Sequence, residues 1–292
     1  MITKADVNML PGLKKIWQVC FGDDEKGAGF VFDNLLGPTQ MLVQTDENNS
    51  PVAMLNWKRL RFTTPKQAFA GAYIYGVGTL PEYRGRGIST ALMQKADEIL
   101  RQEGVALSCL IPAEESLFGF YANRGYHMQF SYKAVRVYRE DIPRPSGQGV
   151  LRVAALEDLH AQRAAAFGSR ALLGAWDAPY LRYTGMECRF YGGEVLRFFS
   201  GDNQGYAVCY PRGNSILVKE AALPKQDISP LLVALDVRYR AESYELRLPA
   251  DFDLGNKWPG EILPFAMVKW YDNESANAVS SGGAPWFAFG LD

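Results

Sequence analysis

The sequence contains few of the residues that build metal or redox centres. Of its 292 residues, only four are cysteines and two are histidines. The cysteines lie far apart and form no CxxC pair: Cys20, Cys109, Cys188 and Cys209. A Cys/His metal cage is therefore excluded, and we expect no metal and a reduced, cytoplasmic setting.

Neither sign of charge is in excess. The chain has 31 basic and 32 acidic side chains, for a formal net charge of −1. A nucleic-acid binder or a polybasic membrane binder needs a basic excess to offset phosphates, so neither kind of partner is expected. No apolar run approaches the ~18 residues of a membrane span, and residues 1–17 lack the apolar core of a signal peptide. Nothing in the sequence indicates an oligomeric state.

What is present is the composition of a folded protein. The chain is 48% hydrophobic, 13% aromatic and 22% charged, which excludes disorder as its main state. At about 150 residues per domain, the length suggests two domains. The stretch PRPSGQG at 143–149 is rich in proline and glycine, and it predicts a linker between domains at 1–142 and 150–292.

The first half is predicted to alternate helices and strands. Apolar residues at three- and four-residue spacing indicate a helix over 88–100, and the continuous apolar run at 105–111 is typical of a central strand. The glycine-bearing stretch 21–29 is predicted to be a polar loop. The other predictions are a helix at 13–21, strands at 40–45, 51–62 and 70–80, a helix at 114–123 and the last strands within 126–137.

The second half repeats this order weakly. Leu223-Pro224 corresponds to Leu80-Pro81, and AMVKWY at 266–271 corresponds to KAVRVY at 133–138. Because these short matches occur in the same order in both halves, they predict a duplicated fold. The elements predicted here are a helix at 156–167, a hairpin of strands at 196–200 and 205–210, a helix at 228–239 and a strand at the segment YELRLP.

A glycine-rich turn in the first half carries the chemical signal. It follows the strand that ends at Leu80-Pro81 and precedes an amphipathic helix, and it consists of Arg84, Gly85, Arg86, Gly87, Ile88 and Ser89. Glycines let the backbone turn tightly, and the helix N-terminus offers unpaired N–H donors and partial positive charge, so the turn suits a pyrophosphate. The alternative is a plain strand-to-helix turn with solvated arginines. A P-loop is excluded by the absence of GxxxxGK[ST], and GRGIST does not complete GxGxxG.

The pattern Arg84-x-x-Gly87-x-Ser89 resembles the [Q/R]xxGx[G/A] signature of the GNAT family of acyl-CoA-dependent N-acetyltransferases. Ser89 departs from it, although serine is small enough for a close approach. The resemblance covers the whole first half, including FYANRGY. It implies an α/β fold (α+β, mixed sheet) in which helices flank a central mixed sheet, with acetyl-CoA as cosubstrate. The second half lacks the turn, so the resemblance implies a tandem arrangement with a degenerate second copy.

The resemblance also implies where the donor binds. In such a fold the strands at 73–80 and 105–111 splay apart, and pantetheine pairs with the backbone of Val77, Gly78 and Thr79. Gly76 and Gly78 leave that approach open, and an N–H near Thr79 polarises the thioester carbonyl. Asn123 is expected to hydrogen-bond the cofactor, although asparagine is also common at helix ends without a ligand.

Tyr121 stands at the family's position for the tyrosine that protonates the departing thiolate. A phenol and a thiol of similar basicity are matched for that transfer. The alternative is an aromatic ring that only packs, like its neighbours Phe118 and Phe120. Direct attack by the amine is favoured over a route through Cys109, which lies in a buried-looking strand.

The base that deprotonates the amine has several candidates. Glu114 and Glu115 begin a helix, where the dipole alone favours acids. The acidic loop residues 23–25 could attract a cationic amine. The apolar tail at 280–292 is expected to form a final strand between the two halves and to bring Asp292 to the site. The tandem enhanced intracellular survival acetyltransferases use the chain-terminal carboxylate as base, although they end in an aromatic residue. The alternative for this tail is a strand that only covers the core.

These features predict an N-acetyltransferase that acts on a primary amine of a small molecule by direct attack. A non-catalytic acyl-CoA-binding sensor or scaffold is the first alternative. An acetyltransferase acting on protein lysines or N-termini is the second. The sequence does not identify the acceptor or exclude acyl groups longer than acetyl.

Overall fold

The computed structural model describes residues 1–37, 40–143, 149–277, 279 and 282–290. The predicted linker at 143–149 falls largely on residues 144–148, which lie outside the described residues, so the two domain boundaries stay a prediction. Among the described helices, none is both long enough and apolar enough to cross a membrane.

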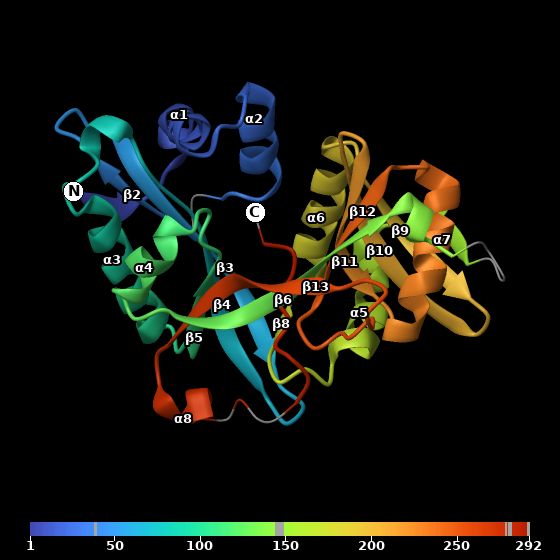
Figure 1. Ribbon diagram of the computed structural model, residues 1–292. Helices are drawn as coiled ribbons and strands as arrows, with labels where there is room; N and C mark the ends of the chain where they lie inside the picture. Colours follow the sequence, from blue (N-terminus) through green and yellow to red (C-terminus); the bar gives the residue numbers. More distant parts are fainter. Residues whose placement is uncertain (38–39, 144–148, 278, 280–281, 291–292) are drawn as a thin grey trace.

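The first half contains an alternation of helices and strands close to the predicted one (Figure 1). Its helices and strands are β1 (Ile2–Lys4), α1 (Leu10–Phe21), α2 (Glu25–Asn34), β2 (Met41–Thr45), β3 (Pro51–Thr63), β4 (Ala68–Thr79), α3 (Ile88–Gln102), β5 (Leu107–Leu110), α4 (Ser116–Ala122) and β6 (His127–Tyr138).

The polar loop predicted at 21–29 is wrong, because helix α2 begins within it. The Asp24 side chain accepts a hydrogen bond from the Gly27 N–H at 2.7 Å, which caps the helix N-terminus. Gly27 and Ala28 are buried, and a Cβ at Gly27 would lie 3.1 Å from the Asp23 carboxyl carbon. Of the glycines that suggested a loop, Gly27 is therefore a small residue at a packed helix start, while Gly22, with a φ of 79°, ends α1. Also, the strands predicted within 126–137 form one strand, β6 (His127–Tyr138), and not several.

The second half adds a comparable set of elements: β7 (Val150–Val153), α5 (His160–Phe167), β8 (Leu173–Ala175), α6 (Ala178–Phe190), β9 (Glu194–Ser200), β10 (Asn203–Arg212), β11 (Ser215–Ala222), α7 (Ile228–Tyr239), β12 (Ser243–Pro249), β13 (Gly260–Trp270) and α8 (Asn273–Asn277). The predicted hairpin, helix and strands are confirmed here, whereas α6 had no counterpart among the predictions. Its N-terminus is capped by Asp177, which accepts from the Tyr180 N–H at 2.9 Å.

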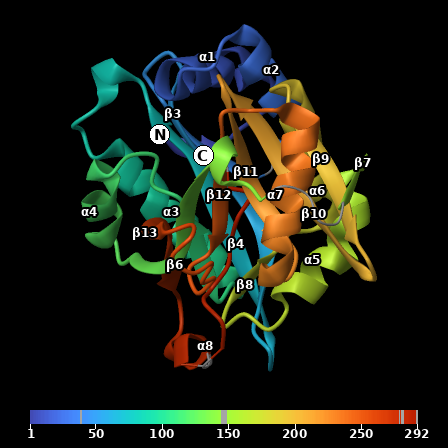
Figure 2. The same ribbon diagram turned by 45° about the vertical axis from the view of Figure 1, so that its right-hand side comes forward.

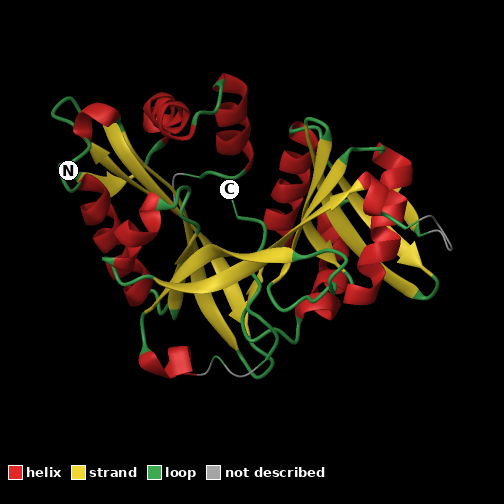
Figure 3. Cartoon of the chain, in the orientation of Figure 1, coloured by secondary structure: helices red, strands yellow, loops and turns green. Residues whose placement is uncertain are grey.

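One mixed sheet runs through both halves (Figures 1 and 3). Its main strand order is β1-β2-β3-β4-β5-β13-β6-β12-β11-β10-β9-β7, with β8 paired to β3. Strand β13, from the end of the chain, lies between β5 and β6 and is antiparallel to both. Strand β6, from the first half, in turn pairs with β12. The two halves therefore share strands at their junction, where Figure 2 shows β6 and β13 from a second direction.

Helices cover both faces of the first-half sheet. Leu92 and Tyr121, from α3 and α4, pack with Ile74 in one cluster. Ile16 and Trp17, from α1, belong to the cluster on the other face. That second cluster also contains side chains of α2, α5 and α6, so it is the core that joins the two halves.

The tail from residue 283 to 290 closes this joint core. The side chains of Trp286, Phe287 and Phe289 are 2% exposed or less. Phe287 contacts rings from both halves, including Phe62 at 6.0 Å and Trp176 at 4.9 Å between centroids. Docking of the tail between the halves is thus confirmed. A regular final strand is wrong, because the tail makes only isolated bridges to residues 170 and 173, and Ala288 and Phe289 have positive φ angles that interrupt extended backbone.

Candidate active site

Strands β4 and β5 separate as predicted. They pair in parallel at only three positions, from Gly71 with Leu107 to Tyr73 with Cys109. Beyond Tyr73, β4 continues to Thr79 while β5 ends at Leu110. Among the described residues, the backbone edge of β4 on that side therefore has no strand partner along residues 74–79, and an extended ligand could pair there.

A bulge in β4 lies within residues 74–79, in the pairing of β4 with β3. Met54 of β3 pairs with Gly78 and Asn56 pairs with Tyr75, so Gly76 and Val77 together oppose one residue. Gly76 has a φ of 60°, and a Cβ there would lie 2.8 Å from Asn56 Nδ2. A bulge of this kind bends the strand and leaves backbone groups out of the ladder.

A side chain at Gly76 or Gly78 would point at helix α1. A Cβ at Gly76 would lie 2.9 Å from the Trp17 ring, and one at Gly78 would lie 3.2 Å from Cys20 Cβ. The two glycines thus allow α1 to pack directly on β4. This packing role was missed by the sequence reasoning, which assigned both glycines to ligand approach alone.

Two buried polar groups beside the bulge have no hydrogen-bond partner among the described residues. They are the Thr79 hydroxyl and the side-chain amide of Asn56, which is 1% exposed. Unpaired polar groups cost free energy in a protein interior, so such groups commonly bind a ligand or water. Asn56 was missed by the sequence reasoning, although a lone asparagine in the apolar run VAMLNW was a usable signal.

The turn before α3 has the geometry of an anion site. Gly85 and Gly87 both have φ angles of 74°, and open space surrounds the position of a Cβ at each. Helix α3 begins at Ile88 with Gly87 as N-cap and no side-chain cap. The N–H groups of residues 88–90 therefore have no acceptor within the helix, and they add to the positive end of the helix dipole.

The two arginines of the turn are held against its backbone. Arg84 Nε donates to the Thr79 carbonyl at 3.0 Å, and Arg86 Nη2 donates to the Glu82 carbonyl at 2.9 Å. The Arg86 guanidinium also lies 5.1 Å from the centroid of the Tyr83 ring. Both cations are exposed, so they add positive charge at the surface of the turn.

Tyr121 lies in α4 with its ring buried against Phe120 and Tyr126, at centroid distances of 5.1 and 6.0 Å. Burial raises the pKa of the Tyr121 phenol to about 12, although the positive charge of Arg124 acts in the opposite direction. The phenol therefore keeps its proton at neutral pH. Its hydroxyl makes no hydrogen bond to the residues that the structure describes.

Arg124 connects this helix to the turn. Its guanidinium donates to the Phe120 carbonyl at 2.6 Å and to the Thr90 hydroxyl in the first turn of α3. Asn123, the C-cap of α4, is exposed and borders the same cavity of about 380 Å³ as Thr90 and Arg124. The structure thus brings Asn123 close to the start of α3. Arg124, which fixes that arrangement, was not singled out from the sequence.

The acidic residues considered as the base or as a site for a cationic amine have different surroundings. Asp23 accepts hydrogen bonds from Trp17 Nε1 at 2.6 Å and from the Tyr191 hydroxyl at 3.4 Å, so it joins the two halves. Asp24 caps α2, while Glu114 and Glu115 are exposed before α4. Leu291 and Asp292 lie outside the described residues.

The described end of the tail reaches the separated strands. A Cβ at Gly290 would lie 3.1 Å from the Tyr73 hydroxyl and within contact of Ile111, the residue after β5. The Lys219 ammonium donates to the Gly290 carbonyl at 3.1 Å, and the Tyr180 hydroxyl donates to the Phe289 carbonyl at 2.8 Å. Side chains of the second half therefore hold the tail at the point where β4 leaves β5.

The cysteines near the site are poor nucleophiles. Burial raises the pKa of the Cys109 thiol well above its ordinary value, and burial also raises that of Cys20. The thiolate is the reactive form of cysteine, so a raised pKa disfavours attack at neutral pH.

The arrangement of these parts suits an extended ligand with a phosphate-bearing end. The free edge of β4 suits an extended amide-containing arm, and the uncapped start of α3 suits a pyrophosphate. The open space at Gly85 and Gly87 leaves room for a phosphate to approach the backbone.

Sequence comparison gives one match. The family model described as an acetyltransferase (GNAT) domain matches residues 2–128. A search among curated proteins finds no match.

Solved structures resemble nearly the whole chain. A probable N-acyltransferase from Enterococcus faecalis V583, described as a conserved protein of unknown function, has a TM-score of 0.75 at 16% identity, covering 92% of this chain and 72% of that one. A GCN5-related N-acetyltransferase from Anabaena variabilis ATCC 29413 has a TM-score of 0.76 at 14% identity, with coverages of 93% and 73%. Eis1 from Mycobacterium abscessus has a TM-score of 0.70 at 17% identity, with coverages of 96% and 76%. At these identities the likeness shows a shared fold, and it extends over both halves.

Proposed function

Because residues 2–128 belong to the acetyltransferase domains of the GNAT family, we propose that this chain transfers the acetyl group of acetyl-CoA to a primary amine of a small molecule. The observation that carries the proposal is the unpaired edge of β4 beyond Tyr73, which leads to an uncapped helix start at Ile88. The segment from β4 to α3 thus offers backbone pairing at one end and anion binding at the other.

In this proposal the backbone of Val77, Gly78 and Thr79 pairs with the pantetheine arm. The N–H groups of the turn from Arg84 to Ser89 bind the pyrophosphate, and both arginines supply opposite charge. Asn123 donates or accepts one further hydrogen bond, which its position beside Thr90 at the same cavity supports.

Tyr121 acts as the general acid. The thioester supplies an acetyl carbon that an amine can attack directly. As the new carbon–nitrogen bond forms and the carbon–sulfur bond breaks, Tyr121 donates its phenolic proton to the departing sulfur. A backbone N–H near Thr79 stabilises the negative charge that develops on the carbonyl oxygen. The raised pKa of the buried phenol supports this role, because the proton is present when it is needed.

The proposed base is Asp292. Support comes from the path of the tail, which brings Gly290 against Tyr73 and Ile111 two residues earlier. A carboxylate there would accept the proton that the amine loses. Asp23, which lies between α1 and α6, supplies negative charge that favours a cationic acceptor.

Thiol release from acetyl-CoA in the presence of small primary amines tests the proposal. We expect turnover with at least one amine and, by calorimetry, one acetyl-CoA bound per chain, because the second half lacks the glycine turn. Acetyl-CoA binding without turnover across a broad panel of amines would indicate that the chain is an acyl-CoA sensor and not an enzyme. Turnover only with peptides that contain lysine or a free N-terminus would indicate that the acceptor is a protein and not a small molecule.

A further inference from the structure

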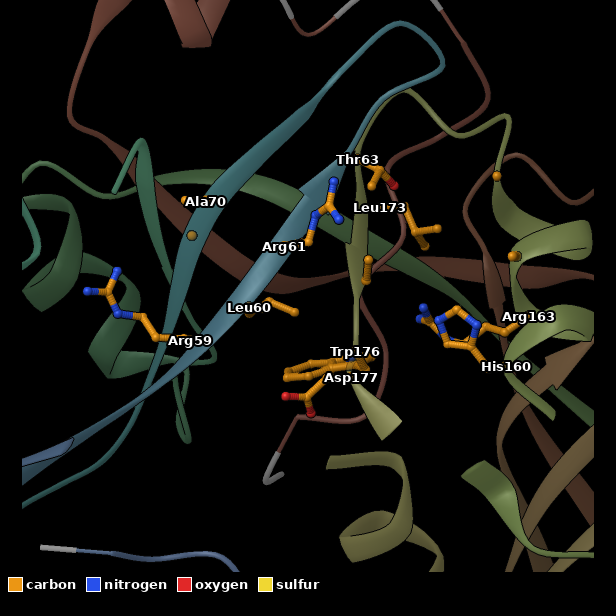
Figure 4. Close-up of a pocket in the computed structure, with 14 residues that line it drawn as sticks. Arg59, Leu60, Arg61, Thr63, Ala70, His160, Arg163, Leu173, Trp176 and Asp177 are labelled. Carbon is orange, nitrogen blue, oxygen red and sulfur yellow. The ribbon is translucent and has the colours of Figure 1, made fainter. Parts of the chain in front are cut away.

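A cavity of about 730 Å³ lies between β3, β8 and α5 (Figure 4). Leu60 of β3, Leu173 of β8 and the Trp176 indole give it apolar walls. Its volume is within the range of about 300–1,000 Å³ that is typical of small-molecule pockets. None of the residues assigned above to acetyl transfer lines this cavity.

Two polar side chains at the cavity have no partner in the part of the chain that the structure describes. Arg61 on β3 and His160 at the start of α5 border it from opposite sides (Figure 4), and both are exposed. Neither makes an ion pair or a side-chain hydrogen bond with the described residues. A guanidinium and an imidazole are therefore available to a ligand at this cavity.

The other charged residues at the cavity are each compensated. Arg59 pairs with Glu103 at the end of α3, and the Asp177 carboxylate lies 3.4 Å from Lys58 Nζ. The buried Arg163 pairs with Glu220 at 3.2 Å. The uncompensated formal charge in the lining is thus the positive charge of Arg61.

We propose that this cavity binds a small organic anion with an apolar body. A carboxylate or a phosphate can form two parallel hydrogen bonds to the Arg61 guanidinium, which presents its donors as a planar fork. The His160 ring adds a further donor from the opposite side. The apolar part of the ligand then fills the space against Leu60, Leu173 and Trp176.

The cavity is connected to the tail through two of its own lining residues. Trp176 Nε1 donates to the Phe287 carbonyl at 3.0 Å, and Arg163 Nη2 donates to the same carbonyl at 3.2 Å. Three residues later, Gly290 lies against Tyr73 and Ile111. A ligand in the cavity therefore touches the groups that hold the tail, and its binding changes the rate of acetyl transfer. This second part rests on the proposed function, whereas the binding itself does not.

Calorimetry with octanoate as the probe tests the binding. Octyl phosphate is the second anionic probe, and octylamine is the control, because it has the same alkyl group and the opposite charge. Saturating CoA is included so that the site at β4 is not available to the probe. We expect octanoate or octyl phosphate to bind at least about tenfold more tightly than octylamine, as one charge-assisted contact allows. The anion that binds more tightly identifies the head group that the cavity prefers. Equal binding of octylamine, or no binding of either anion, overturns the proposal.

Three variants locate the site. Arg61→Glu should weaken the preferred anion at least about tenfold, because it replaces attraction by repulsion. Arg152→Glu is the matched control, since it makes the same charge change at an exposed residue of β7, the last strand in the sheet order. Ala164→Trp, on the exposed face of α5 that lines the cavity, should abolish binding by filling it. Equal effects of the two charge reversals, or unchanged affinity in Ala164→Trp, would contradict the assignment.

The effect of the bound anion on acetyl transfer is measured separately. With the site saturated, kcat/KM for acetyl transfer should change in the parent protein and stay constant in Ala164→Trp. Anion binding without any change in kcat/KM would refute the connection to the tail and leave the binding site established. Because binding is measured without turnover, the result does not depend on whether the chain transfers acetyl groups.

Discussion

At the scale of single residues, the proposed reaction depends on a phenol that keeps its proton. We expect Tyr121→Phe to lower kcat by roughly 10²-fold or more, the range for loss of a general acid, with little change in acetyl-CoA affinity. Because burial raises the pKa of Tyr121 to about 12, the protonated form persists throughout pH 6–10. The loss should therefore be similar across that range in steady-state thiol-release assays.

Tyr126→Phe is the matched control for this experiment. Tyr126 lies in the same aromatic cluster, and its hydroxyl hydrogen-bonds Ser108 Oγ at 2.8 Å. Ser108 Oγ keeps its hydrogen bond with the Tyr271 hydroxyl at 2.9 Å, so removal of the Tyr126 hydroxyl should lower stability by about 0.5–1.5 kcal/mol, the net worth of one hydrogen bond, and leave kcat intact. A Tyr121→Phe variant with full kcat at every pH would show that Tyr121 only packs and is not the general acid.

The glycine turn offers a second prediction. Gly87→Glu should abolish acetyl-CoA binding, because the new side chain occupies the phosphate approach and repels the phosphates. Gly104→Glu is its control, since Gly104 also has a positive φ of 70° with open space around it, but lies beyond the other end of α3. Backbone strain and added charge are thus equal in the two variants. Titration calorimetry showing equal affinities for both would remove the turn from the site.

The glycine turn and Tyr121 could be identified as candidates from the sequence, because a local motif carried each. The unpaired amide of Asn56 could not, because its significance depends on which strands surround it. The same is true of Arg124, whose contact with Thr90 crosses between two helices. Local spacing predicts such residues only when both partners belong to one motif.

At the scale of elements, the tail is held by hydrogen bonds that the side chains of Tyr180, Trp176 and Lys219 donate to its backbone carbonyls. Removing residues 291–292 while keeping Trp286, Phe287 and Phe289 should leave the fold intact, because those rings supply the buried apolar area. If Asp292 is the base, kcat/KM should fall by at least about 10²-fold. The fall should be partly relieved at higher pH, where more of the amine is already deprotonated. Full kcat/KM in a stably folded variant would show that the tail serves packing alone.

Phe287→Ala separates stability from catalysis. This fully buried ring packs on residues of both halves, so its loss should lower the free energy of unfolding by about 3–5 kcal/mol. Phe190→Ala, at a 43% exposed position on α6, is the control and should cost much less. Chemical denaturation measures both, and equal losses would contradict the docked position of the tail.

Most strands and helices could be predicted from periodicity, because one face of each is buried against the core. Helix α2 could not, because its two glycines resemble a loop and its cap depends on Asp24. The tail could be predicted to dock from its aromatic content but not to bend at Ala288 and Phe289, where local conformation is fixed by hydrogen bonds to Tyr180 and Trp176.

At the scale of the whole molecule, the two halves share their sheet. A fragment of residues 1–142 would lack β13, so the facing edges of β5 and β6 would be exposed. Exposed strand edges promote aggregation. We therefore expect this fragment to aggregate and to become soluble when residues 150–292 are co-expressed. A monomeric fragment with a cooperative thermal transition would show that the first half is complete without β13.

The position of β13 also fixes when the first half can be finished during synthesis. The ribosome must add residues 139–259 after β6 before the strand that separates β5 from β6 begins to emerge. At about 5–20 residues per second, that delay is roughly 6 to 24 s. Throughout this interval β5 and β6 lack the strand that lies between them in the native sheet, so the nascent chain exposes both strand edges until β13 has been translated.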